Sequence, residues 1–116
     1  MESKLFANNH FHFIGIGGIG MSAIAMALLK KGFSVSGSDL IKNDQILLLK
    51  KMGATIFMVQ GKENIDIIKK TYPSKELIIV FSSAIREENK ELIYSHKKNL
   101  TIKHRSEILS AIMRTY

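Results

Sequence analysis

Short apolar runs and longer amphipathic stretches alternate along this chain. The short runs are typical of strands, because their residues alternate or stay apolar over about four to eight positions. They cover residues 10–14, 33–37, 54–59, 76–81 and 100–102. Apolar residues spaced three and four apart follow each run and predict helices. These helices cover residues 19–31, 44–52, 64–72, 87–98 and 106–114.

This alternation predicts an α/β fold. Strict strand–helix order with short links favours a Rossmann-like parallel sheet of about five strands, with right-handed crossovers and helices on both faces. The chain has 116 residues, a length typical of one compact domain. We therefore interpret residues 1–116 as a single domain.

The composition narrows the class of protein. Hydrophobic residues make up 46% of the chain and charged residues 23%, a balance that excludes disordered and fibrous chains. There is no cysteine, and the four histidines lack the spacing of ligand pairs on one helix, so we expect no metal site. No stretch approaches the length of a signal peptide or of a membrane span of about 20 apolar residues. We expect a cytoplasmic protein with no membrane partner.

The net charge of +7 raises the question of nucleic acid binding. The lysines occur as scattered pairs at predicted helix ends and polar faces: Lys30-Lys31, Lys50-Lys51, Lys69-Lys70 and Lys97-Lys98. Nucleic-acid footprints instead cluster on one face or interleave with aromatic residues. We expect a solvated basic surface with no nucleic acid partner, whose positive field favours an anionic ligand.

A glycine-rich turn carries the main functional signal. Gly15, Gly17 and Gly20 follow the first strand in a G-x-G-x-x-G spacing and open a helix. In such a turn the first glycine permits the tight bend, the second lets backbone amides approach a diphosphate, and the third allows close helix–strand packing. The helix N-terminus adds partial positive charge. The sequence therefore predicts a site for the diphosphate of a nucleotide-type ligand.

Polar residues after the first two strands have two interpretations each. Asp39 follows the second strand at the interval of about 20 residues expected for a group that binds ribose hydroxyls, but it also fits a cap of the next helix. Ser36, Ser38 and Asn43 fit that capping role as well. Ser22 either donates to a phosphate or bonds the backbone of its own helix.

Further candidates follow the last two strands, because parallel sheets bind ligands at the carboxyl ends of their strands. Ser82 and Ser83 supply hydroxyls there, or cap the next helix. Arg105 offers a forked guanidinium to a phosphate or carboxylate, and Ser106 is expected to cap the closing helix.

Other polar residues receive no functional role. His10 and His12 are placed at the start of the first strand, away from the ligand edge, and are assigned no function. The sequence contains no nucleophile–base pair and no G-x-x-x-x-G-K-[ST] loop for ATP, so the chain alone is expected to bind rather than react.

Four blocks in order resemble the N-terminal domain of the Mur ligases. They are residues 13–22 (FIGIGGIGMS), 36–39 (SGSD), 82–85 (SSAI) and 105–109 (RSEIL). The match runs from about Phe11 to the C-terminus and also includes residues 53–56 and 63–65. Four ordered blocks are more specific than the glycines alone.

The resemblance implies part of an ATP-dependent enzyme of peptidoglycan synthesis in the cytoplasm. In members that use UDP-N-acetylmuramate, ATP converts the lactyl carboxylate to an acyl phosphate, which L-alanine attacks. The N-terminal domain holds the UDP part of the substrate. ATP and magnesium bind a central domain and the amino acid a C-terminal one, so this chain is expected to be inactive alone and to have no cofactor.

The resemblance also implies which residues contact the UDP part. They are Gly15, Gly17, Gly18, Ile19, Gly20, Met21, Ser22, Ser38, Asp39, Leu40, Ser82, Ser83, Ala84, Ile85 and Arg105. The chain departs from the family pattern at two positions. Lys62 stands where the family usually has histidine, which puts any stacking contact there in doubt, and Lys90 stands where it usually has proline.

Two other functions share the glycine turn. The NAD-binding half of a dehydrogenase has the same turn and acidic residue. A nucleotide-sensing regulatory domain of a channel or transporter is a third hypothesis, supported only by the small size of the chain.

Overall fold

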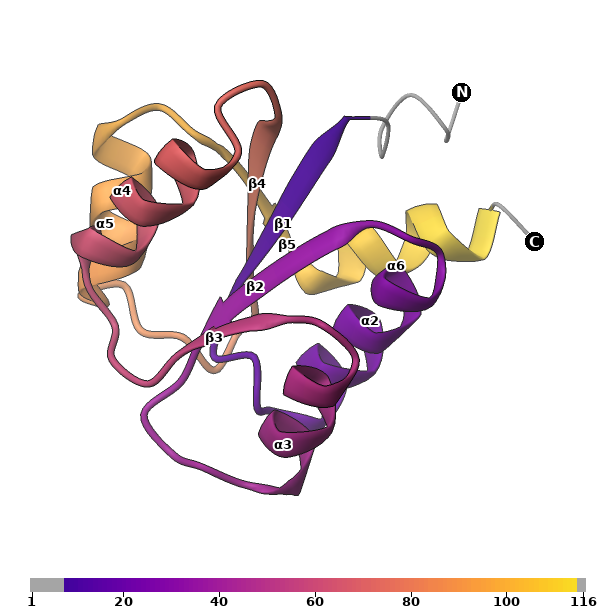
Figure 1. The fold of residues 1–116 in the computed structure, drawn as a ribbon. Coiled ribbons are helices and arrows are strands. Elements are labelled where there is room, and N and C mark those ends of the chain that lie inside the picture. Colours follow the sequence, from indigo (N-terminus) through magenta and orange to yellow (C-terminus); the bar gives the residue numbers. More distant parts are fainter. Residues whose placement is uncertain (1–7, 115–116) are drawn as a thin grey trace.

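The computed structural model describes residues 8–114 as one parallel sheet between two layers of helices (Figure 1). The strands are β1 (Asn9–Ile14), β2 (Ser34–Ser38), β3 (Thr55–Phe57), β4 (Glu76–Phe81) and β5 (Thr101–His104). They lie in the order β3-β2-β1-β4-β5, and every neighbouring pair is parallel. The order reverses between β1 and β4, which is where open α/β sheets bind ligands. The predicted fold class is confirmed.

Within the described residues the sheet is covered by five helices: α2 (Ile19–Lys30), α3 (Asp44–Lys51), α4 (Lys62–Thr71), α5 (Lys90–Lys97) and α6 (Arg105–Arg114). Helices α2, α3 and α6 lie on one face, and α4 and α5 on the other (Figure 1). Each layer has its own apolar core. Phe11 and Phe13 belong to the core under α2, α3 and α6, and Ile14 and Ile79 to the one under α4 and α5.

The face of the sheet under α4 and α5 contains a polar row. Successive strand residues point to opposite faces, so His10 and His12 of β1 lie on the side opposite Phe11 and Phe13. The parallel register places His10 beside Ser34 and His12 beside Ser36. Both histidines and Ser36 are buried. Strands β1 and β2 therefore carry polar side chains into the interior under α4 and α5.

Several element boundaries differ from the sequence predictions by one to three residues, and two of the differences concern predicted helix starts. Helix α5 starts at Lys90 rather than residue 87, because the Asn89 side chain caps it by accepting from the amides of Glu91 and Leu92 at 3.0 and 3.1 Å. Strand β5 runs directly into α6, which leaves Ser106 inside the helix. The expected Ser106 cap is wrong.

Candidate functional site at the carboxyl edge of the sheet

The glycine turn joins β1 to α2 at the carboxyl edge of the sheet. Gly15 has a φ of +81°, which L side chains rarely adopt, and a Cβ there would lie 2.9 Å from Cδ1 of Ile85. The amides of Gly15 and Ile16 both donate to the carbonyl of Ser38, at 2.8 and 3.0 Å. The turn after β1 is therefore bound to the end of β2 and packed against the loop after β4.

The amide of Gly17 already has an acceptor within the chain. It donates to Oδ2 of Asp39 at 2.8 Å, and a Cβ on Gly17 would lie 2.8 Å from the same oxygen. The side chain of Asn43 donates to the Gly17 carbonyl at 3.1 Å. Gly17 is thus needed for the approach of Asp39, which occupies its amide in this structure. A contact between Gly17 and a diphosphate stays a prediction.

The amides that face outward belong to the next residues. Helix α2 has Gly18 as its N-cap, with no capping side chain, and the amide of Ser22 donates back to the Gly18 carbonyl at 2.8 Å. The amides of Ile19, Gly20 and Met21 precede that bond and have no acceptor within the helix. Gly18, Ile19 and Gly20 are exposed. This helix end is suited to an anion.

Arg105 lies against the same helix end. A Cβ on Gly20 would lie 3.3 Å from Cζ and Nη1 of Arg105, so the guanidinium covers the α-carbon of Gly20. The expected reason for Gly20, close packing on the strand, is therefore wrong. Close packing on a strand instead explains Gly37 of β2, since a Cβ there would lie 2.8 Å from Cγ2 of Ile16.

Asp39 organises the loop after β2. Its Oδ1 accepts from the amides of Leu40 and Ile41, at 2.8 and 3.2 Å. The cap of α3 is Asn43, which accepts from the amide of Ile46 at 3.0 Å, so the capping interpretation of Asp39 is wrong. A carboxylate has about four acceptor positions, and Asp39 uses three of them for backbone amides. One remains for a ligand hydroxyl.

The hydroxyls of Ser22 and Ser82 form hydrogen bonds with backbone groups two or three residues away. Ser22 is buried, and its hydroxyl donates to the Ile19 carbonyl at 3.1 Å, so the helix-backbone interpretation holds. The Ser82 hydroxyl accepts from the amide of Ala84 at 3.3 Å. Neither Ser82 nor Ser83 caps α5, because Asn89 does.

Ser83 is oriented by His104. Nδ1 of His104 accepts from the amide of Ser106 at 3.2 Å, so the neutral ring carries its proton on Nε2. That Nε2–H donates to the Ser83 hydroxyl at 3.1 Å. The Ser83 proton then points away from His104 and is available to a ligand.

Two cavities adjoin this edge. One of about 290 Å³ is lined by Gln60, Ala84, Ile85 and neighbours from the loop after β4. The other, of about 430 Å³, shares Gln60 and lies at the start of α4 and α5. Lys62 and Lys90, the two departures from the family pattern, both line the larger one. Across residues 8–114 no three His, Asp or Glu side chains gather to hold a metal ion, and no helix is long and apolar enough to cross a membrane.

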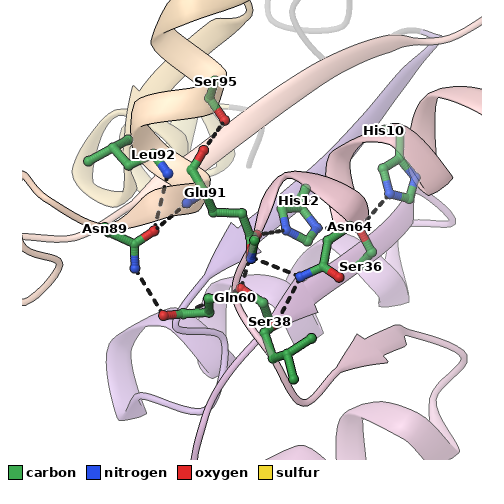
Figure 2. A network of polar contacts seen from close by, with 12 residues as sticks. His10, His12, Ser36, Ser38, Gln60, Asn64, Asn89, Glu91, Leu92 and Ser95 are labelled. Atoms are coloured by element: carbon green, nitrogen blue, oxygen red, sulfur yellow. Dashed lines mark hydrogen bonds and ion pairs between the residues drawn. The ribbon is translucent and has the colours of Figure 1, made fainter.

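A buried carboxylate, Glu91, was missed by the sequence reasoning. Its Oε1 accepts from Nε2 of His12 and from the Ser38 hydroxyl at 3.0 Å, and its Oε2 accepts from the Gly61 amide at 3.1 Å and Asn64 Nδ2 at 2.9 Å (Figure 2). His12, Ser38 and Glu91 are fully buried. The sequence signal for a buried polar cluster on this face was the alternation of histidine or serine with other residues in β1 and β2.

His10 is buried too, which corrects the view that these histidines have no role. Its ring stacks on Tyr72 with centroids 4.3 Å apart. Burial, and then electrostatic interaction with His12 and Lys75, lowers the pKa of His10 to about 3. His10 is therefore a neutral hydrogen-bonding group at neutral pH.

Comparison with known proteins agrees with the family resemblance of the sequence. Residues 10–116 match the model of the Mur ligase family, catalytic domain. A UDP-N-acetylmuramate–L-alanine ligase from Prochlorococcus marinus subsp. pastoris is 60% identical over 116 residues, which are 100% of this chain and 24% of that protein. The ligase of that name from Clostridium acetobutylicum is 42% identical over 89% of this chain and 21% of its own length.

Solved structures agree. The UDP-N-acetylmuramate-alanine ligase of Thermotoga maritima superposes with a TM-score of 0.74 at 25% identity, covering 91% of this chain and 23% of that one. A UDP-N-acetylmuramate:L-alanyl-gamma-D-glutamyl-meso-diaminopimelate ligase from Neisseria meningitides shares the fold with a TM-score of 0.78, over 90% of this chain and 31% of its own. This chain spans about a quarter of the length of the curated relatives it matches. Because the family match covers residues 10–116, this chain belongs to the Mur ligase family.

Proposed function

We propose that this chain is the domain that binds the UDP part of UDP-N-acetylmuramate in a cytoplasmic ligase that adds L-alanine to it during peptidoglycan synthesis. The observation that carries the proposal is the exposed start of α2, where the amides of Ile19, Gly20 and Met21 have no acceptor within the helix and the Arg105 guanidinium lies over Gly20. Backbone donors, a helix dipole and a forked cation at one point are the elements of a diphosphate site. The relatives named for this substrate support the choice of ligand.

The remaining edge residues fit a nucleoside beside that diphosphate. The unused acceptor position of Asp39 suits a ribose hydroxyl, and the Ser83 hydroxyl supplies a donor. Leu40 and Ile41 are 67% and 71% exposed next to Asp39, and their apolar side chains would cover a ligand at this loop. Gly18, Ala84 and Ile85 lie at the same edge, and the buried Ser38 supports the glycine turn through its carbonyl.

The ligation chemistry is assigned to other parts of the whole protein. The described residues contain no acidic cluster for magnesium and the sequence has no ATP loop, so neither group fits here. ATP, magnesium and L-alanine would bind in the part of the ligase that this chain does not span. The chain alone is proposed to bind its substrate and to leave it unchanged.

The test is a titration of the 15N-labelled chain with UDP-N-acetylmuramate, followed by amide chemical shifts. We expect shifts at Ile19–Met21 and at residues 82–85, with the Gly17 amide less affected because Asp39 already binds it. UDP should perturb the first group and NADH should bind more weakly. Absence of shifts at millimolar ligand, or tighter binding of NADH, would contradict the proposal.

A further inference from the structure

A continuous chain of hydrogen bonds crosses the buried face of the sheet and ends on Glu91 (Figure 2). It starts at Lys75, whose Nζ lies 3.4 Å from the Ser34 hydroxyl. Ser34 is 2.8 Å from Nδ1 of His10, and Nε2 of His10 is 2.8 Å from the Ser36 hydroxyl. Ser36 is 2.7 Å from Nδ1 of His12, whose Nε2 contacts Oε1 of Glu91.

The carboxylate end sets the direction of this chain, and the ammonium end agrees with it. An ionised carboxylate can only accept, so a neutral His12 donates from Nε2 and accepts from Ser36 at Nδ1. Ser36 must then accept from His10, and Ser34 accepts from Lys75 while donating to Nδ1 of His10. His10 then carries its proton on Nε2 and donates to Ser36, which donates in turn to His12. Every link has one donor and one acceptor, and the low pKa of His10 keeps its ring neutral.

At the acceptor end, Glu91 joins the segments that form the ligand edge. It binds the Ser38 hydroxyl at the end of β2, the Gly61 amide that precedes α4, and Asn64 within α4. Gln60 extends the connection, since it donates to Ser38 at 3.3 Å and accepts from Asn89 at 2.9 Å. The Glu91 carboxylate therefore connects the segments that follow β2, β3 and β4.

We propose that Glu91 is a positioning residue for the UDP-binding edge, held as a carboxylate at the acceptor end of a one-way hydrogen-bond chain from Lys75 through His10 and His12. The part concerning the ligand rests on the proposed function. The direction of the chain does not depend on it. Ser38 is the link to the site, because its carbonyl accepts from the amides of Gly15 and Ile16 in the glycine turn.

The proposal makes a specific claim about Glu91→Gln. Gly61 and Asn64 cannot stop donating, since one is a backbone amide and Nδ2 of Asn64 also donates to the Val59 carbonyl at 2.7 Å. The new carbonyl must face them, and the new NH₂ must face His12 and Ser38, which can both become acceptors. His12 then moves its proton to Nδ1, Ser36 turns round, and His10 moves its proton to Nδ1 as well.

The experiment is NMR of the chain with 15N-labelled histidine near pH 7.5, which distinguishes the two tautomers. In the wild type we expect both rings to carry the proton on Nε2, and in Glu91→Gln both to carry it on Nδ1. In Glu91→Gln/Ser36→Ala only His12 should switch. A wild-type His10 protonated on Nδ1, or a His10 that ignores Glu91→Gln, would overturn the chain, and the wild-type result needs no variant to fold.

The positioning role is tested by the affinity for UDP-N-acetylmuramate. Glu91→Leu should weaken binding at least about tenfold through loss of edge order, while Glu91→Gln stays within about threefold because its bonds are all satisfied. Ile68→Ala, which empties buried volume on the same face, is the control for general destabilisation and should bind like the wild type. Equal affinity of the wild type and Glu91→Leu would overturn the role. If the wild type itself fails to bind, the proposed function fails while the tautomer result stands.

Discussion

The amide of Gly17 and the carboxylate of Asp39 form a 2.8 Å hydrogen bond between the turn after β1 and the loop after β2. The same carboxylate accepts from the amides of Leu40 and Ile41. The acidic residue that follows β2 therefore shapes the glycine turn from inside the protein. Its pairing with Gly17 leaves the amides at the start of α2 as the donors that we propose for a ligand.

Replacing Asp39 with alanine should lower both stability and affinity. The change removes the acceptor of three backbone amides, and because the site is partly open to water we expect a cost of about 1–2 kcal/mol in the free energy of unfolding. Urea denaturation measures it, and titration with UDP should show weaker binding. A variant as stable and as tight-binding as the wild type would contradict the proposed role of Asp39.

Gly37→Ala should be destabilising for a steric reason. The new Cβ would lie 2.8 Å from Cγ2 of Ile16, in the buried space under α2. Overpacking of this kind costs about 1–3 kcal/mol. Gly18→Ala is the matched control for stability, since its Cβ would meet the Gly15 carbonyl at an ordinary 3.6 Å. Thermal unfolding of the two variants checks the difference, and equal melting temperatures would refute it.

Lys90→Pro should stabilise the chain. Lys90 is the first residue of α5, where the amide has no acceptor within the helix, and Asn89 already has the extended φ of −56° and ψ of 125° that precede proline well. A compatible proline adds about 0.4–1 kcal/mol by restricting the unfolded chain. Lys97→Pro, in the last turn of α5, should instead be strongly destabilising. Denaturant midpoints compare the two.

Stability should fall in mild acid because of His10. Its pKa is about 3 in the folded protein against an ordinary 6.5, so between these values the unfolded state binds more protons. This contribution is complete above pH 6.5 and is lost as the pH falls towards 3. By linkage we expect a loss of about 2 kcal/mol between pH 8 and pH 5. Unfolding measured across that range should show it, and His10→Gln should flatten the profile.

Arg105→Ala should weaken the binding of UDP and leave that of uridine unchanged. The guanidinium lies over Gly20 at the exposed start of α2, so it would contact phosphate rather than the nucleoside. Loss of a charge-assisted contact of about 1.4 kcal/mol corresponds to about a tenfold rise in Kd. Lys51→Gln removes one positive charge at the far end of α3 and serves as control. Equal losses of UDP affinity in both variants would indicate that Arg105 acts through the overall positive charge of the chain instead of through a contact with the phosphate.

Local signals predicted most of the fold. Alternating or continuous apolar runs located all five strands, and the 3.6-residue period located the helices. Gly32 and Gly53, with φ of +92° and +106°, follow the ends of α2 and α3 as their positions indicated. Two of the boundaries that were wrong depend on side chains. Asn89 shortens α5 by accepting from two amides, and His104 allows α6 to start without a serine cap.

The site was predicted in part, and the roles within it changed. Local spacing identified the glycine turn and Asp39 and placed them at one edge. It could not show that Gly17 faces Asp39, or that Gly20 lies under Arg105, because these pairs are 22 and 85 residues apart in the chain. The assignment of the site to a UDP substrate remains a proposal that the titration tests.

The sequence by itself determined the order of strands and helices and the position of the glycine turn, since both follow from periodicity and from backbone preferences over a few residues. Only the tertiary structure decided which amides of that turn remain open. The amides that are occupied donate to Ser38 and Asp39, at and just after the end of another strand, β2. The tertiary structure alone also brought Glu91 to His12, 79 residues earlier. A buried carboxylate is stable only where hydrogen-bond donors converge on it. The four donors to Glu91 come together only in the folded chain.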